Sequence, residues 1–245
     1  MATANLAANI LTVLSLFCGF ASMIFSLEGC FTPACWAIIL SVILDGLDGQ
    51  VARKNPVPSE LGKQLDSLVD VVAFGVAPSI LGYVFIYKHF KFGAAVALFA
   101  YLICSVWRLA KYNLTPKSEM LNHFIGLPTT ASGALLASFI LIYRKQEDMM
   151  IPEFVPDLLS PQFTPFIFLV LVLLLAFLMV SRVPYLNLDG FKQFAGSKFK
   201  LAIFVLVAAL SAAGAFKKAG VVLFSLFLIY LIFSPFVVKR LNSSY

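Results

Sequence analysis

Long apolar stretches alternate with short polar, proline-rich or glycine-rich segments along the chain. A helix needs about 20 apolar residues to cross a bilayer, and the stretches here approach that length. Strands of transmembrane β-barrels are about ten residues long and alternate in polarity, unlike these continuous stretches. We therefore predict an all-α, polytopic transmembrane helix bundle of eight helices, near residues 9–27, 33–53, 59–87, 92–112, 127–145, 163–181, 199–216 and 220–238.

The composition supports a membrane protein and excludes several other classes. Hydrophobic residues make up 61% of the chain and charged residues 12%. Soluble domains are about 45–50% apolar and about 25% charged. With a mean hydropathy of +0.95, these values exclude a soluble globular enzyme, a disordered regulator and a small disulfide-bonded scaffold.

The basic residues predict the orientation of the chain in the membrane. The net charge is +6, from 18 Lys and Arg against 12 Asp and Glu. Counting connections from the first helix, the even-numbered ones, the helix ends beside them and the C-terminus hold 12 of the 18 basic residues. Because cytoplasmic loops are enriched in Lys and Arg, we place both termini and the loop at 54–58 in the cytoplasm. Loop charges account for the basic balance, and we expect no nucleic-acid partner.

Two of the predicted helices carry four aspartates, although a charged side chain costs about 2.5–3.5 kcal/mol at a helix centre on insertion scales. Asp45 and Asp48 are three residues apart, and Asp66 and Asp70 four apart, so each pair shares one helix face. Gly49 and Ala52 extend the first face, and Gly62 extends the second. A short proline-bounded loop joins the two helices, which predicts antiparallel neighbours whose carboxylates converge below the cytoplasmic surface.

Such a cluster favours divalent cations. Four carboxylates in a low-dielectric cleft repel one another, and two divalent ions would balance their charge. Oxygen ligands without His or Cys favour Mg²⁺ or Mn²⁺. Gly49, Ala52 and Gly62 leave room for a phosphate-bearing ligand, and Arg53 is placed to bind a phosphate. The pattern is typical of two-metal phosphoryl transfer, the alternatives being ion pairs with neighbouring Lys and Arg or the ion path of a cation-coupled transporter.

The residues from Asp45 to Asp70 form the pattern D-x2-D-G-x2-A-R-x8-G-x3-D-x3-D. This pattern resembles the signature of the CDP-alcohol phosphatidyltransferase family at every defined position. Further segments, which bring the resemblance to about residues 8–185, are similar to the phosphatidylserine synthase branch of that family: Asn9–Thr12, Phe17–Gly19, Ser59–Asp70, Phe74–Pro78, Arg108–Asn113, Phe124–Pro128 and Met179–Arg182.

The resemblance implies an architecture and a role for each site residue. It implies a catalytic six-helix core at residues 1–185. Two further C-terminal helices, at 186–245, lie beyond that core, and packing and a homodimer contact are the roles left open for them. It implies that Asp45, Asp48 and Asp66 bind two divalent ions, and that Asp70 completes the metal site and is the general base. The implied cytidine diphosphate pocket is lined by Asn9, Thr12, Gly49, Ala52, Arg53, Gly62 and Asp66. A cytoplasm-facing polar set at the ends of the fourth and sixth helices is expected to hold the acceptor carboxylate or the lipid phosphate, the alternative being ordinary positive-inside anchoring: Arg108, Lys111, Asn113 and Arg182.

The implied reaction transfers the phosphatidyl group of CDP-diacylglycerol to L-serine, giving phosphatidylserine and CMP, with Mg²⁺ or Mn²⁺. The enzyme would be a multi-pass protein of the inner (cytoplasmic) membrane, surrounded by membrane lipids, with its active site facing the cytoplasm. The same chemistry with inositol phosphate, glycerol phosphate or choline as acceptor, or with an archaeal CDP-archaeol donor, stays open. A cation-coupled transporter is the alternative from another class.

Overall fold

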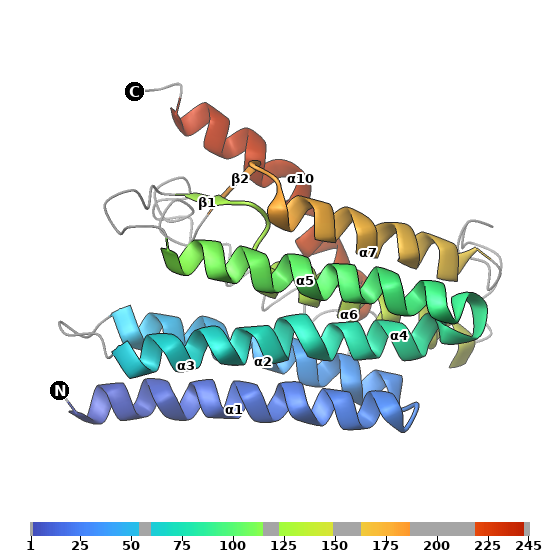
Figure 1. Cartoon of the computed structure of the whole chain (residues 1–245), viewed down its shortest axis with the longest axis horizontal. Coiled ribbons are helices and arrows are strands. Elements are labelled where there is room, and N and C mark those ends of the chain that lie inside the picture. Colours follow the sequence, from blue (N-terminus) through green and yellow to red (C-terminus); the bar gives the residue numbers. More distant parts are fainter. Residues whose placement is uncertain (1, 54–59, 115–122, 149–162, 187–218, 243–245) are drawn as a thin grey trace.

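A computed structural model gives the fold of the chain, and it describes residues 2–53, 60–114, 123–148, 163–186 and 219–242. The described residues form a bundle of helices that run along its long axis, with one pair of short strands at one end (Figure 1). The elements are α1 (Ala2–Leu27), α2 (Phe31–Arg53), α3 (Glu60–Asp70), the π-helix η1 (Val71–Val76), α4 (Ala77–Phe90), α5 (Phe92–Leu114), β1 (His123–Ile125), α6 (Thr129–Asp148), α7 (Thr164–Val180), β2 (Pro184–Leu186) and α10 (Ala219–Asn242).

The predicted all-α membrane bundle is confirmed. Five helical runs are long and apolar enough to cross a bilayer: Leu6–Leu27, Phe31–Val51, Glu60–Phe90, Phe92–Leu114 and Ala219–Lys239. The helices α6 and α7 supply two shorter apolar segments, Thr129–Tyr143 and Thr164–Val180. The helix predicted at 199–216 lies outside the described residues, and each of the others has a counterpart. The chain is therefore an integral, multi-pass membrane protein.

The helix α6 lies at the centre of the bundle. Every side chain from Ala131 to Leu141 is buried, although Ser132 and Ser138 are polar. The neighbours of α6 include α2, α7 and α10, while α5 packs against α7 and α4. Large apolar side chains on α1, α5, α7 and α10 are exposed instead. This distribution is the one expected of a bundle whose outer surface faces lipid rather than water.

A stripe of small and polar residues lets α1 approach its neighbours closely. Ser15 and Ser41 link α1 to α2, with their hydroxyl oxygens 2.7 Å apart, and the Ser41 hydroxyl lies 3.1 Å from the Ser15 carbonyl. A Cβ placed on Gly19 would lie only 2.8 Å from Cα of Ala73 in η1. Small residues at helix crossings allow this close backbone approach in membranes. The stripe thereby fixes the position of Thr12, one turn before Ser15.

The third apolar run continues through Pro78, as predicted, and the π-helix η1 lies directly before it. Proline has no N–H, so the carbonyl four residues earlier, that of Phe74, has no normal α-helical donor. The Tyr101 hydroxyl supplies that donor from α5, at 3.1 Å. The Ser79 hydroxyl donates to the Gly75 carbonyl at 2.7 Å. These two side chains supply hydrogen-bond donors to the Phe74 and Gly75 carbonyls of η1, which directly follows Asp70.

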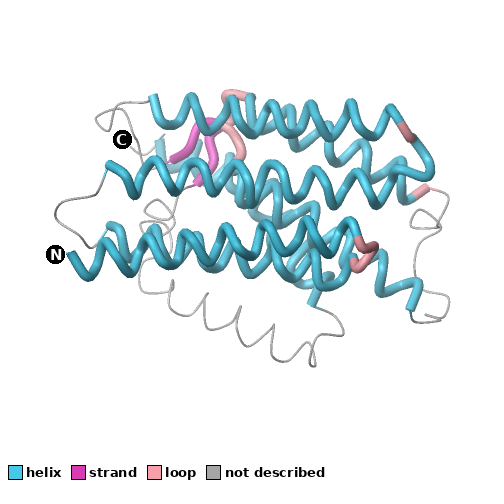
Figure 2. The backbone as a smooth tube through the Cα atoms, turned by 60° about the horizontal axis from the view of Figure 1, so that its bottom comes forward, coloured by secondary structure: helices cyan, strands magenta, loops and turns pink. Residues whose placement is uncertain are grey.

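The strands β1 and β2 form an antiparallel ribbon, with Phe124 opposite Tyr185, and the sequence analysis missed both strands. Figure 2 places the ribbon at the end of the bundle that also holds the N-terminus. After β1, Gly126 takes a φ of +84°, and its N–H donates to the Val183 carbonyl at 2.8 Å. The Leu127 N–H donates to the Leu178 carbonyl at 3.1 Å. These bonds attach the ribbon to the end of α7.

Candidate active site

The aspartates of α2 and α3 meet near one end of the bundle. Carboxylate oxygens of Asp45, Asp48 and Asp66 all lie within 4.8 Å of one another. Asp48 is buried, with 4% of its surface exposed, and the other two are half-buried. At a rise of about 1.5 Å per residue, the three lie about 8–12 Å from the adjoining end of their helix. The structure thus brings together side chains that the spacing predicted to converge.

Asp70 belongs to the same cluster. Its side chain is hydrogen-bonded to that of Asp45, and it interacts electrostatically with Asp66 and with Arg108 of α5. Asp70 is also the last residue of α3 before the π-helix η1 begins. It therefore interacts both with the clustered carboxylates and with the guanidinium of Arg108.

Helix α1 closes the aspartate cluster from a third side. The Thr12 hydroxyl lies 2.9 Å from Oδ2 of Asp48 and 3.0 Å from the Ala8 carbonyl, so its single proton is shared between two acceptors. Thr12 itself is buried, with 4% exposed. One turn earlier on α1, Asn9 is half-buried. The hydroxyl orients the most buried of the carboxylates toward the rest of the cluster.

The donor set suits a hard divalent cation. It consists of carboxylate oxygens that come close enough together to share an ion, and oxygen-only ligation is the preference of Mg²⁺ and Mn²⁺. Without a cation, these carboxylates would stand in a largely apolar bundle facing one another's charge, which is costly. The structure therefore contains a group of carboxylates able to bind metal.

A pocket of about 70 Å³ lies between the ends of α5 and α7 and strand β1, and its residue Arg108 interacts with Asp70 of the cluster. Arg108 is its most buried cation, with 8% exposed, and its Nη1 donates to the Thr129 hydroxyl at 3.2 Å. The guanidinium carbon lies 5.6 Å from the ring centre of Tyr112 and 5.6 Å from that of Phe124. Such contacts fix the plane of a guanidinium. The pocket is lined by Trp107, Arg108, Lys111, Tyr112, His123, Phe124, Ile125, Met179, Val180 and Ser181.

Arginine and lysine, rather than histidine, provide the positive charge of this pocket at neutral pH. Burial lowers the pKa of His123 below its usual value of 6.5, so its imidazole is neutral at pH 7. Lys111 lies on the exposed side of α5 at the pocket. An anionic group entering the pocket would therefore meet the fixed guanidinium of Arg108 and the ammonium of Lys111.

The remaining predicted residues fall into three places. Gly49 and Gly62 are half-buried on α2 and α3. Ala52 and Arg53 end α2, and their side chains lie outside the described part of the chain. Asn113 donates to the Ser67 hydroxyl at 2.8 Å and so links α5 to the helix of Asp66. Arg182 is exposed after α7, next to the pocket residue Ser181.

Sequence reasoning missed several residues that shape the pocket. Thr129, Tyr112 and Phe124 hold the Arg108 guanidinium, yet each looks in sequence like an ordinary loop or helix-end residue. Tyr112 lies within the Arg108–Asn113 segment and Phe124 within the Phe124–Pro128 segment of the family resemblance, which was their only signal. Tyr230 of α10 lies near Arg108, and nothing local in the sequence relates residues so far apart.

The comparisons with known proteins point to one family. The profile of the CDP-alcohol phosphatidyltransferase family matches residues 5–177. A CDP-diacylglycerol–serine O-phosphatidyltransferase of Helicobacter pylori is 36% identical over 200 residues, which cover 81% of this chain and 77% of that protein. An archaetidylserine synthase of Methanothermobacter thermautotrophicus is 31% identical over 188 residues, 74% of this chain and 70% of that protein. A Mycobacterium tuberculosis CDP-diacylglycerol–serine O-phosphatidyltransferase is 36% identical over 137 residues, 54% of this chain and 48% of that protein.

Proposed function

Because the chain belongs to the CDP-alcohol phosphatidyltransferase family, we propose that it transfers the phosphatidyl group of CDP-diacylglycerol to L-serine. The products are phosphatidylserine and CMP. The observation that carries the proposal is the meeting of Asp45, Asp48 and Asp66 beside a pocket with a fixed guanidinium. Relatives named for serine as the acceptor match most of the chain and support that choice.

We assign the metal site to Asp45, Asp48, Asp66 and Asp70, with Mg²⁺ or Mn²⁺ as the ions. Two divalent ions held there would supply charge neutralisation for the diphosphate and for the departing CMP. Thr12 keeps Asp48 oriented for this task through its hydrogen bond. Outer contacts of this kind set the orientation of metal ligands.

Asp70 acts as the general base. The hydroxyl of serine loses its proton to the Asp70 carboxylate as its oxygen attacks the phosphorus that bears the diacylglycerol group. The new oxygen–phosphorus bond forms as the bond to CMP breaks, and the two electrons of that bond leave with CMP. Asp70 fits this role because it interacts with both the carboxylate cluster and Arg108, and a base must reach the proton that it removes.

The two substrates approach from opposite sides of Asp70. Asn9, Thr12, Gly49, Ala52, Arg53 and Gly62 line the cytidine diphosphate side, where small residues leave room for a phosphate. Arg108 and Lys111 receive the carboxylate of serine in the adjoining pocket, with Asn113 and Arg182 at its border. The fixed plane of the Arg108 guanidinium suits a planar carboxylate.

The site opens toward the cytoplasm in the proposed orientation. The start of α1, the end of α2, the start of α3 and the ribbon lie at one end of the bundle (Figure 1). In the sequence, the even-numbered connections, the helix ends beside them and the C-terminus hold most of the basic residues, which cytoplasmic loops favour. We propose that in a bacterial cell the protein lies in the inner membrane, with water-soluble serine arriving from the cytoplasm and the acyl chains of the donor remaining in the bilayer.

The test is an assay of purified protein with CDP-diacylglycerol and Mn²⁺, in which candidate alcohols are offered one at a time. Release of CMP together with phosphatidylserine, dependent on serine, is the expected result. Asp70→Asn should abolish turnover, whereas Glu60→Gln, which changes an exposed carboxyl at the start of α3, should retain it. CMP release only with inositol phosphate, glycerol phosphate or choline would contradict serine as the acceptor, and no CMP release with any alcohol would favour a transporter.

One of the relatives indicates a second candidate for the lipid donor substrate. The relative named archaetidylserine synthase covers 74% of this chain, and its name implies an ether-linked archaeal lipid. The assay therefore includes CDP-archaeol beside CDP-diacylglycerol. Higher kcat/KM with CDP-archaeol would assign the ether lipid as the donor while leaving the serine chemistry unchanged.

A further inference from the structure

We infer that the C-terminal helix α10, which lies beyond the six-helix region that resembles the family, is a positioning element for the acceptor pocket. Its residues Tyr230 and Ser234 hold strand β2 in place, and β2 holds the strand that covers Arg108. The inference rests on the proposed function in one respect, namely that the Arg108 pocket receives the acceptor.

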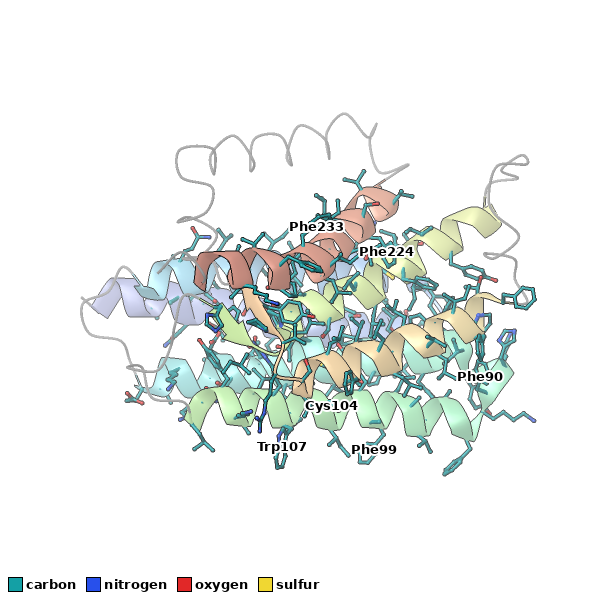
Figure 3. All side chains as sticks on the ribbon, turned by 90° about the horizontal axis from the view of Figure 1, so that it is seen from above. Phe90, Phe99, Cys104, Trp107, Phe224 and Phe233 are labelled. Carbon is teal, nitrogen blue, oxygen red and sulfur yellow. The ribbon has the colours of Figure 1, made fainter. Side chains whose placement is uncertain are left out.

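Both backbone groups of Leu186 are bound by side chains of α10. The Tyr230 hydroxyl donates to the Leu186 carbonyl at 2.9 Å, and the Leu186 N–H donates to the Ser234 hydroxyl oxygen. Ser234 is buried, with 4% exposed, and Tyr230 is half-buried. Tyr230 and Ser234 are four residues apart and so project from one face of α10. Figure 3 shows α10 lying over the ribbon.

This pair of bonds completes an edge that would otherwise lack partners. Strand β2 pairs with β1 along one side only, because the sheet has two strands. The backbone groups of an edge strand need hydrogen-bond partners when they are buried. Leu186 is buried, with 6% exposed, and the hydroxyls of Tyr230 and Ser234 supply those partners.

From β2 the contacts lead directly to the pocket. Tyr185 stands opposite Phe124 across the ribbon, and the ring centres of Tyr185 and Tyr230 are 6.1 Å apart. Phe124 in turn covers the Arg108 guanidinium and meets Tyr112 edge to face, with ring centres 5.7 Å apart. The position of α10 therefore sets the position of one aromatic wall of the pocket.

Tyr230 also lies near the guanidinium of Arg108, the most buried cation of the pocket. A change at Tyr230 acts on the pocket through the ribbon. The hydrogen bonds of Tyr230 and Ser234 lead to Leu186 and not to the aspartate cluster, so we expect the KM for CDP-diacylglycerol to be far less sensitive to α10 than the KM for serine.

The test compares steady-state kinetics of Tyr230→Phe, Ser234→Ala and the double variant with the wild type. Each lost hydrogen bond should raise KM for serine by about three- to tenfold, while kcat and KM for CDP-diacylglycerol stay within about twofold. Ser234→Thr keeps the hydroxyl and should restore the KM for serine. Hydrogen–deuterium exchange of the full-length protein should show faster exchange at the amides of Gly126 and Leu186.

Two variants serve as matched controls. Ser225→Ala removes an exposed hydroxyl from the same helix, and Tyr87→Phe removes an exposed phenol at the far end of α4. Both should match the wild type in KM for serine and in amide exchange. They distinguish the effect of removing a hydroxyl in general from the effect of removing the hydrogen bonds to Leu186.

Three results would overturn the inference. One is an unchanged KM for serine in a folded double variant, and another is an equal rise in KM for both substrates. The third is unchanged amide exchange at Leu186, which would mean that α10 does not hold the ribbon. If the wild type uses another alcohol, the proposed function fails, and the KM for that alcohol then decides whether α10 positions the pocket.

Discussion

Replacing Thr12 by valine should weaken metal binding without unfolding the protein. Valine has nearly the shape of threonine but lacks the hydroxyl that lies 2.9 Å from Oδ2 of Asp48. Asp48 is almost fully buried, so water cannot easily replace the lost donor. Its carboxylate could then rotate away from those of Asp45 and Asp66. The three carboxylates would no longer be held in a geometry in which they can share one ion.

The size of the effect follows from the hydrogen bond. A bond to a charged group contributes about 1.5–3 kcal/mol, which corresponds to about 10- to 150-fold in a binding constant. The Thr12 proton is divided between Asp48 and the Ala8 carbonyl, 3.0 Å away, which favours the lower end of that range. We therefore expect the Kd for Mn²⁺ to rise about tenfold, within the 10- to 100-fold range known for outer contacts of metal ligands.

Electron paramagnetic resonance measures this Kd directly, because the signal of free Mn²⁺ diminishes as the ion binds. Thr12→Ser keeps the hydroxyl and should bind Mn²⁺ within about threefold of the wild type. Ser26→Ala removes a different buried hydroxyl of α1, one that donates to the Ser22 carbonyl at 2.7 Å. It should leave the Kd unchanged. Wild-type affinity in a folded Thr12→Val protein would refute the role given to Thr12.

Other changes test the elements around the site. Tyr101→Phe leaves the Phe74 carbonyl before Pro78 without its donor and should destabilise the protein by about 1–3 kcal/mol, seen as a lower Tm in detergent; an unchanged Tm would show that η1 does not need Tyr101. Gly126→Ala should lower the Tm because φ is +84° and a Cβ would collide with the Met179 carbonyl, whereas Gly93→Ala, where the nearest atom is 3.9 Å away, should not. Burial lowers the pKa of His123. As the pH falls below about 6.5, the unfolded chain therefore binds more protons at this residue than the folded protein does. His123→Gln should therefore lose less stability than the wild type between about pH 7 and pH 5, and equal losses in thermal unfolding would contradict the assignment.

The aspartate cluster was accessible from sequence because its residues are local. The helical period shows which residues share one helix face. Charged residues within apolar helices indicate a functional role rather than a packing role. Asp45 and Asp48 on one helix, and Asp66 and Asp70 on the next, satisfy both tests. A short connection then limits how far apart the two helices can lie. The convergence of the four carboxylates could therefore be predicted from the sequence alone.

The strands and the π-helix escaped prediction for the opposite reason. Strands of three residues are too short to show an alternating pattern, and β1 and β2 form only because the ends of α5 and α7 lie side by side. Similarly, Pro78 in sequence signals a missing hydrogen bond, but only the packing of α5 on η1 brings Tyr101 to the Phe74 carbonyl.

The sequence by itself determined that this is a helical membrane protein with a carboxylate site on its second and third helices, and it indicated the family. Tertiary structure alone decided which side chains complete that site. Thr12 meets Asp48 because α1 packs against α2, and Tyr230 meets the ribbon because α10 folds back over it. The physical reason is that a chain's pattern specifies the faces of its helices, whereas the partner of each face depends on how all of the helices pack together.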